Sequence, residues 1–120
     1  MPKFLAVFTG SEESRKASGW DDLSEADRSA REAKGMQAWG DWMQRNAAIV
    51  ADQGGPLGAT KKVGKSGVSD VRNNLAGYTV VEADSHEAAA RLFENHPHFA
   101  IFPGDGVEIM PLLPIPGAPT

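Results

Sequence analysis

The chain has 120 residues, which is enough for one hydrophobic core but not for two, so a single domain over residues 1–120 is expected. Hydrophobic residues make up 41% and charged residues 23%, an ordinary globular composition that excludes wholesale disorder. A net charge of -4 without a basic cluster argues against a nucleic-acid partner, and the lack of cysteine removes disulfides and thiolate chemistry. The early apolar run Phe4 to Phe8 is too short for a signal or membrane segment. We therefore expect a cytoplasmic protein without a membrane partner.

The first predicted strand runs from Lys3 to Phe8 and is apolar on both faces, with Phe4, Ala6 and Phe8 on one face and Leu5 and Val7 on the other. A strand that is apolar on both faces belongs in the middle of a sheet that is covered on both sides. A polar loop is predicted from Gly10 to Asp22. It contains Trp20, which either clamps the loop to the body or contacts a ligand.

A long helix is predicted from a cap at Ser24 to about Asn46, because Ser24 and Asp27 have capping-box spacing. The aromatic and methionine residues of this helix recur at helical spacing, and such a stripe is typical of a hydrophobic core. Two tryptophans within four residues exceed what a helix on a small sheet needs, however, so one of them is expected to line a cavity. The predicted inner face carries Ala26, Ala30, Ala33, Trp39 and Met43, with Met36 and Trp42 close to its edge.

A second strand is predicted from Ile49 to Asp52, before the turn GGPLG. Ala59 to Val63 then leads into a hairpin around Gly64 to Gly67, and Val68 to Asn74 is predicted to be an exposed return. Gly64, Lys65 and Ser66 resemble the end of a P-loop. That interpretation fails because the preceding glycine is one residue too far away and no helix-forming stretch follows.

The next stretch combines a strand, a tight turn and an amphipathic helix. Gly77 to Ala83 alternates as a strand should. Asp84 and Glu87 have the spacing of a capping box, so we expect Asp84 to cap the following helix. Pro97 forbids further helix just after Asn95. The predicted apolar stripe consists of Ala88, Ala89, Leu92 and Phe93.

This stretch, GYTVVEADSHEAAARLFENHPHF, resembles the signature of the YCII-related domain family, in which a Gly-Tyr strand ends in an acidic residue before an alanine-rich helix and a His-Pro or Pro-His. Weaker similarity extends to KFLAVF, GGPLG and VEIMPLLPIPG. The resemblance implies a ferredoxin-like sandwich that pairs into a dimeric α/β barrel. Function in that family is mostly unassigned. Members regarded as enzymes pair a histidine and an aspartate at places that fall near Met36 and at His96, so the resemblance implies that this dyad is absent.

The last predicted strand runs from Val107 to Met110 and follows a turn at 103–106. The full order of elements predicts an α+β, ferredoxin-like βαββαβ sandwich with an additional hairpin. Both helices of such a fold cover the same face of the sheet, yet the strands are apolar on both faces, so a second copy is expected to cover the other face as a homodimer. The proline-rich segment 111–120 is either an arm across the neighbouring subunit or a polyproline-like recognition peptide.

Chemistry is most readily assigned to His96 and His98, which flank Pro97. Three interpretations stay open: a metal pair completed by Asp105 or Glu108, an acid or base oriented by a carboxylate such as Asp52, and two structural histidines. His86 is expected to be exposed. The sequence contains no complete ligand set at a known spacing, so we expect neither a metal nor another cofactor.

The candidate site is a pocket whose mouth is formed by His98 and by the first helix around Met36 and Trp39. The remaining predicted lining residues are Asp52 and Tyr78, and His96 is expected to point more to solvent. The function that these features favour is small-molecule binding by a homodimer without an identifiable catalytic dyad. The alternative is a small-molecule enzyme with lyase-like or other acid and base chemistry at His98 or His96.

Overall fold

The structure, a computed structural model, describes residues 1–117. Its elements in chain order are β1 (Lys3–Thr9), α1 (Glu12–Ser18), the 3-10 helix η1 (Trp20–Asp22), α2 (Glu25–Arg45), β2 (Val50–Pro56), β3 (Thr60–Gly64), β4 (Gly67–Val71), β5 (Leu75–Glu82), α3 (His86–Arg91), α4 (Pro97–Ala100) and β6 (Gly106–Pro111). Within these residues, no helix has the length and hydropathy needed to cross a membrane.

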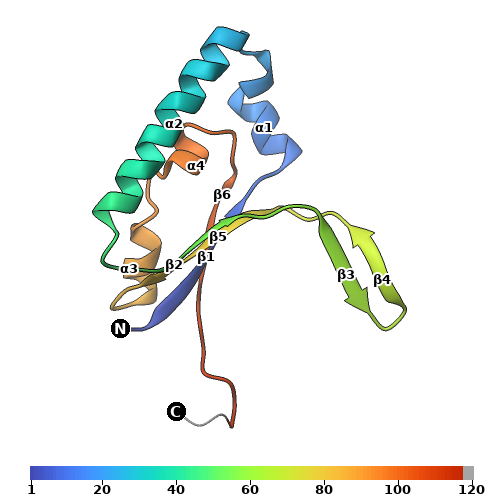
Figure 1. Cartoon of the computed structure of the whole chain (residues 1–120), viewed down its shortest axis with the longest axis vertical. Helices are drawn as coiled ribbons and strands as arrows, with labels where there is room; N and C mark the ends of the chain where they lie inside the picture. The colour runs from blue at the N-terminus through green and yellow to red at the C-terminus, as the bar shows by residue number, and fades with distance from the viewer. Residues whose placement is uncertain (118–120) are drawn as a thin grey trace.

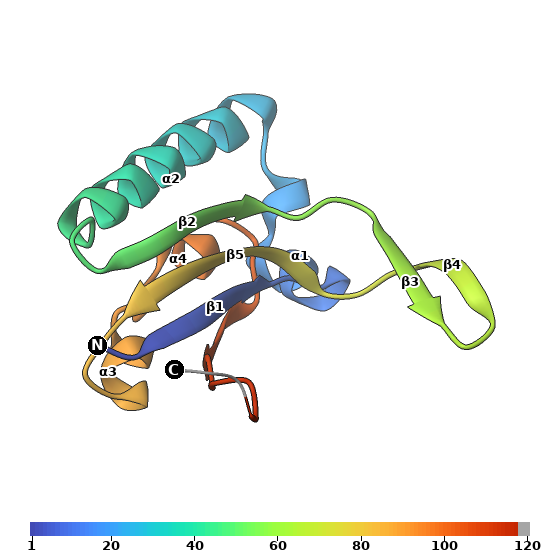
Figure 2. The same ribbon diagram turned by 60° about the horizontal axis from the view of Figure 1, so that its bottom comes forward.

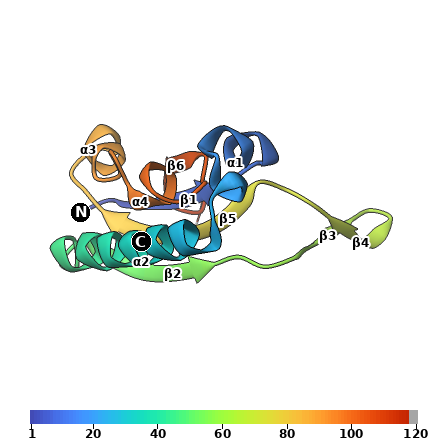
Figure 3. The same ribbon diagram turned by 90° about the horizontal axis from the view of Figure 1, so that it is seen from above.

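Four strands form one antiparallel sheet in the order β2-β5-β1-β6. With α2 between β1 and β2, and α3 between β5 and β6, this order is the ferredoxin-like arrangement, so the predicted α+β fold is confirmed. The strands β3 and β4 pair only with each other. This hairpin projects from the body on the side away from α2 (Figure 1) and stands clear of the sheet when viewed from above (Figure 3).

The two faces of the sheet have different surroundings. Phe4, Ala6, Phe8 and Val81 lie on the face that packs against Trp42 of α2, Ala89 of α3 and Phe93 in one core cluster. The alternate residues of the same strands point to the opposite face, where the register places Leu5 beside Val80 on one side and Met110 on the other. Figure 2 shows β2, β5 and β1 side by side, with α2 running along the sheet.

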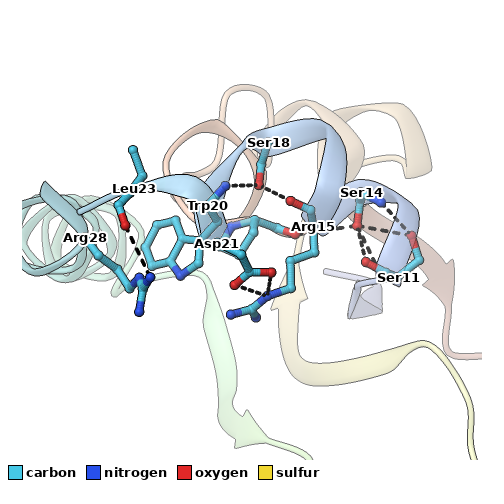
Figure 4. A network of polar contacts seen from close by, with 9 residues as sticks. Ser11, Ser14, Arg15, Ser18, Trp20, Asp21, Leu23 and Arg28 are labelled. Atoms are coloured by element: carbon cyan, nitrogen blue, oxygen red, sulfur yellow. Dashed lines mark hydrogen bonds and ion pairs between the residues drawn. The ribbon is translucent and has the colours of Figure 1, made fainter. Parts of the chain in front are cut away.

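The predicted loop Gly10 to Asp22 is instead largely helical. Ser11 caps α1, because its side chain accepts a hydrogen bond from the Ser14 amide, and the Ser14 hydroxyl accepts one from the Ser11 amide. Figure 4 shows this cap and the ion pair of Arg15 with Asp21 that follows it. Trp20 is buried and its ring lies 5.9 Å from that of Phe102, so it clamps this segment to the body.

The start of α3 lies one residue later than predicted. Ser85, not Asp84, is the cap, because the Ser85 hydroxyl accepts the Ala88 amide hydrogen bond at 3.0 Å. The helix α3 ends at Arg91, earlier than the predicted end at Asn95, and turns follow up to Asn95, which adopts a left-handed conformation with φ of 56°. Pro97 then opens the short helix α4 rather than only stopping the one before it, since proline suits the first helical position.

The buried face of α2 and the bounds of β2 also differ from the predictions. The first half of α2 extends beyond the sheet, so Ala26, Ala30 and Ala33 are exposed and do not form the inner face; the buried residues of this helix are Gly35 and Trp42. The strand β2 begins at Val50 and runs through the predicted turn to Pro56. It can do so because Gly54 takes a φ of 63° in a bulge, where a side chain would collide with the Tyr78 carbonyl.

Candidate functional site

A cavity of about 400 Å³ lies between α2 and the neighbouring strands β2 and β5. None of its lining residues, all within the described chain, is aspartate, glutamate, lysine or arginine. Aromatic and methionine side chains dominate the walls, an arrangement typical of a small-molecule site. The lining residues are Met36, Trp39, Trp42 and Met43 of α2, 53–56 of β2, 76–79 of β5, and Phe8 and His98.

The short helix α4 places His98 at this cavity. His96 is the cap of α4, and its Nδ1 accepts a hydrogen bond from the backbone amide of His98 at 3.0 Å. Pro97 between them occupies the first helical position, where its fixed φ suits the helix and its missing amide leaves no donor unsatisfied. The hydrogen bond from the His98 amide to His96 and the fixed φ of Pro97 therefore both hold the backbone of His98 in place.

The ring of His98 is oriented by the end of β1. Its Nε2 lies 2.7 Å from the backbone carbonyl of Thr9, and because a carbonyl can only accept, Nε2 carries the proton and donates. The same carbonyl accepts the backbone amide of Asp105 at 2.9 Å. A second contact supports this corner, since the Thr9 hydroxyl donates to the Asp105 carboxylate at 3.2 Å.

Burial lowers the pKa of His98 below its usual value of 6.5. The hydrogen bond to Thr9 and the charge of Asp105 act in the opposite direction, without reversing the shift. The ring is therefore mostly neutral near pH 7, with its proton on Nε2 and a lone pair on Nδ1. A neutral imidazole held in one tautomer can accept a hydrogen bond or a proton from a bound molecule.

His96 does not point to solvent as predicted; its side chain is 1% exposed. It lies among the rings of Phe8, Trp39, Trp42 and Phe93, with the Trp39 ring perpendicular at 4.6 Å. Desolvation, with a smaller effect from His98, lowers its pKa to about 4. Its Nε2 is buried without a hydrogen-bond partner among the described residues. His96 is thus a neutral core residue that caps α4.

Asp52 does not orient either histidine. Its carboxylate accepts hydrogen bonds from the Gly54 amide at 2.9 Å and from the Tyr78 hydroxyl at 3.4 Å, and its backbone carbonyl accepts the Thr79 hydroxyl. These contacts shape the bulge of β2 beside the cavity, but Asp52 is not among the lining residues. The expectation that it completes the pocket as a lining residue is therefore wrong.

The alternative in which His96 and His98 form a metal pair finds no geometric support. In residues 1–117, no three side chains of His, Asp or Glu come close enough to hold a metal ion. Each of His96 and His98 has one ring nitrogen engaged, the first by a backbone amide and the second by a backbone carbonyl. His86 is exposed, as predicted, and its Nε2 lies 2.7 Å from the Ile109 carbonyl.

The structure brings four predicted residues to one cavity, namely Met36, Trp39, Tyr78 and His98. Phe8, Trp42 and Thr79 line it too. The pair of tryptophans in α2 predicted that one of them lines a cavity, whereas no local pattern indicated Phe8 of β1 or Thr79 of β5. The segment GGP, predicted as a turn, is part of β2. A glycine-rich stretch that directly follows a strand and precedes a hairpin was the one available signal that the strand continues through a bulge.

Among solved structures, this fold is similar to that of TftG, the 5-chloro-2-hydroxyhydroquinone dehydrochlorinase from Burkholderia phenoliruptrix AC1100, determined as a complex with 2,5-dihydroxybenzoquinone. The two share 16% sequence identity with a TM-score of 0.52, over 90% of each chain. No family model matches the chain, and no curated protein matches it. At this identity the likeness shows the ferredoxin-like fold, while membership of the YCII-related family stays a prediction.

Proposed function

We propose that this chain is a small-molecule-binding protein that works as a homodimer, with its ligand in the cavity between α2, β2 and β5. The observation that carries the proposal is a largely apolar cavity of about 400 Å³ with His98 as a fixed polar group in its wall. Met36 and Trp39 of α2 form the wall that would contact one side of the ligand, and the stretch of β5 that includes Tyr78 borders the cavity on the sheet side.

The structural likeness to TftG supports a small ring compound as the ligand. TftG, which has the same fold, was solved with a single-ring compound. The cavity of this chain has room for one or two fused rings, and its aromatic side chains favour a planar apolar body.

The homodimer is supported by the uncovered face of the sheet. Leu5, Val80 and Met110 lie beside one another on that face, and Met110 is 39% exposed. A second copy facing it would bury on the order of 1,600 Å². We expect light scattering at micromolar concentration to give twice the single-chain mass of 12.8 kDa. A mass equal to that of one chain would contradict the dimer.

The segment after β6 is the proposed arm of this dimer. Leu112, Leu113 and Ile115 are exposed and contribute nothing to the core cluster, which is what an arm that packs on a neighbouring subunit would show in a single chain. The end of the predicted arm, residues 118–120, lies outside the described part of the chain.

A second candidate function is acid or base catalysis at His98. It is favoured by a neutral ring that has one nitrogen fixed on Thr9 and that borders the cavity. The same role does not suit His96, because its ring is enclosed by aromatic side chains and its pKa is lowered to about 4. The enzyme alternative therefore rests on His98 alone.

Tryptophan fluorescence tests the binding proposal. Trp39 and Trp42 line the cavity, whereas Trp20 is buried against Phe102 and is not a lining residue. A panel of planar one-ring and two-ring compounds should therefore quench the wild type and W20F, and should quench W39F less because only Trp42 remains as a cavity reporter. Equal quenching of both variants would place the ligand elsewhere. Absence of any spectral change at millimolar concentration would contradict the proposal. Turnover that is lost in H98Q would favour the enzyme alternative.

A further inference from the structure

We infer that His98 selects among ligands of this cavity by accepting a hydrogen bond at Nδ1, so that the protein prefers an uncharged planar molecule carrying a hydroxyl or N–H donor over the same molecule without one. The inference rests on the proposed function, because it concerns the ligand of that same cavity. It adds the chemical class of the ligand and the atom that recognises it.

The ring of His98 has a fixed polarity. The Thr9 carbonyl already accepts the Asp105 amide at 2.9 Å and the His98 Nε2–H at 2.7 Å. Moving the proton to Nδ1 would set a lone pair of Nε2 against this carbonyl and lose the bond. The neutral ring therefore keeps Nδ1 as an acceptor.

The ring of His98 is packed so that it cannot easily turn over and exchange its nitrogens. Gly104 leaves room for it, since a Cβ at that position would collide with Nε2 and Cε1 of His98. On another side the ring lies 5.2 Å from that of Phe8. The direction of Nδ1 is therefore set by packing as well as by the bond to Thr9.

Nδ1 of His98 is free of hydrogen bonds within the described chain and is not fully enclosed. It makes no hydrogen bond with residues 1–117, and it is not one of the fully buried side-chain nitrogens that lack a partner there. It must therefore reach accessible space. His98 borders the cavity described above and also a shallower hollow of about 590 Å³ beside Gly10 to Glu12 and Asn73 to Ala76.

The other polar groups of the cavity are weaker candidates for this recognition. The Thr79 hydroxyl donates to the Asp52 carbonyl, and the Tyr78 hydroxyl contacts the Asp52 carboxylate. Gln53 is exposed and both donates and accepts, so it does not discriminate. Among residues 1–117, no charged side chain lines the cavity, so an ionised carboxylate would lose its hydration without a counter-ion.

Three matched probes separate the outcomes: 2-naphthol, its methyl ether 2-methoxynaphthalene, and 2-naphthoate. By calorimetry near pH 7 we expect 2-naphthol to bind at least about tenfold more tightly than the ether, because the ether leaves Nδ1 without a donor. The naphthoate should bind more weakly than 2-naphthol. Equal affinity of 2-naphthol and its ether would overturn the inference and leave the proposed function standing, whereas no binding of any probe at millimolar concentration would overturn both.

The variant H98Q tests the assignment to Nδ1. A glutamine amide nitrogen can take the place of Nε2 and keep the bond to Thr9, but it offers no acceptor where Nδ1 lies. We expect H98Q to fold and to bind the two naphthalene probes with similar affinity. Retention of the preference for 2-naphthol in H98Q would overturn the inference.

A second readout does not depend on the variant. In ¹⁵N spectra of the wild type, His98 should show the pattern of an imidazole protonated at Nε2, and the Nδ1 resonance should move on adding 2-naphthol but much less on adding the ether. A ring protonated at Nδ1, or a preference for 2-naphthoate, would overturn the inference. The latter result would direct attention to Arg15 and Arg72 in the shallower hollow.

Discussion

His96 shows how a polar side chain can belong to the core of this protein. Its Nδ1 accepts the amide of His98, while the rest of its ring lies among four aromatic side chains. Only the neutral ring is stable in this position, because a protonated ring would be a buried charge with neither water nor a counter-ion beside it. The folded state is therefore destabilised relative to the unfolded chain whenever the pH is low enough to protonate this histidine in the unfolded chain.

This makes the free energy of unfolding depend on pH. The pKa of His96 falls from 6.5 to about 4 on folding, so between these values the unfolded chain binds more protons and the folded state loses stability as the pH drops. Above pH 6.5 the contribution is fully present, and near pH 4 about 3 kcal/mol has been lost. Urea unfolding at a series of pH values measures this, and His98 adds a loss of the same sign.

The matched control is H96N, which does not titrate but keeps an acceptor at the cap of α4. We expect H96N to be less stable than the wild type at pH 7, because it leaves space among the aromatic rings, and to show a flatter dependence on pH. An unchanged slope in H96N would show that other groups cause the acid sensitivity.

Gly104 gives a second prediction at the scale of single residues. A methyl group there would overlap the ring and carbonyl of His98, so G104A should lower the free energy of unfolding by about 1 to 3 kcal/mol and disturb the bond between His98 and Thr9. Gly106 is the control, because a Cβ there meets nothing within 4 Å. Thermal unfolding and the ¹⁵N spectrum of His98 measure the two effects, and equal behaviour of G104A and G106A would contradict the prediction.

The sequence predicted part of this site for a clear physical reason. Proline fixes the backbone before His98, and the apolar residues after it anchor the chain, so a defined direction for His98 followed from local rules. The burial of His96 did not, because it depends on rings from β1, α2 and the segment after α3 that meet only in the folded chain. The bond from His98 to Thr9 joins residues 89 positions apart, and no local pattern encodes it.

Among the secondary-structure elements, α2 has two glycines in opposite surroundings. A Cβ on Gly35 would collide with the ring of Phe102, whereas one on Gly40 would meet nothing within 4 Å. G40A should therefore raise the free energy of unfolding by about 0.5 to 1 kcal/mol through helix propensity. G35A should lower it by about 1 to 3 kcal/mol, since Phe102 must leave its contacts with Trp20 and Trp39. Urea unfolding of both variants checks the opposite signs.

The same helix shows where pattern analysis succeeds and where it fails. Trp39 and Met43 were correctly placed toward the sheet because they lie over strands. Ala26, Ala30 and Ala33 have the same periodicity, but periodicity gives a face and not the length of the surface beneath it, and here the sheet ends before the helix does. The missed helix α1 had a local signal, since Ser11 and Ser14 have capping spacing and two glutamates follow Ser11.

At the scale of the whole molecule, the chain is less compact than its length predicts. Its radius of gyration is 16.6 Å, against about 14 Å for a compact domain of 120 residues. The projecting hairpin β3–β4 accounts for part of this difference, and its Val63 and Val68 are 77% and 68% exposed. An isolated two-stranded hairpin is only marginally stable in water.

We therefore expect amides of the hairpin to exchange with solvent well before those of β5, which lies between β2 and β1 in the sheet. Hydrogen exchange followed by mass spectrometry measures this, with the peptide that covers β5 as the internal reference. Protection of the hairpin equal to that of β5 would contradict the prediction and would indicate that a partner covers it.

The free-standing hairpin also makes the chain easy to extend. Gly64 and Gly67 pair with each other at the end of the hairpin and with no strand of the main sheet. The turn between these two glycines can therefore be lengthened without moving any strand that borders the cavity. The entropic cost of closing a longer loop grows only slowly with its length. A peptide tag or a small domain inserted between Lys65 and Ser66 would thus be carried at a distance from the ligand, as a handle for immobilising the protein with its cavity unobstructed.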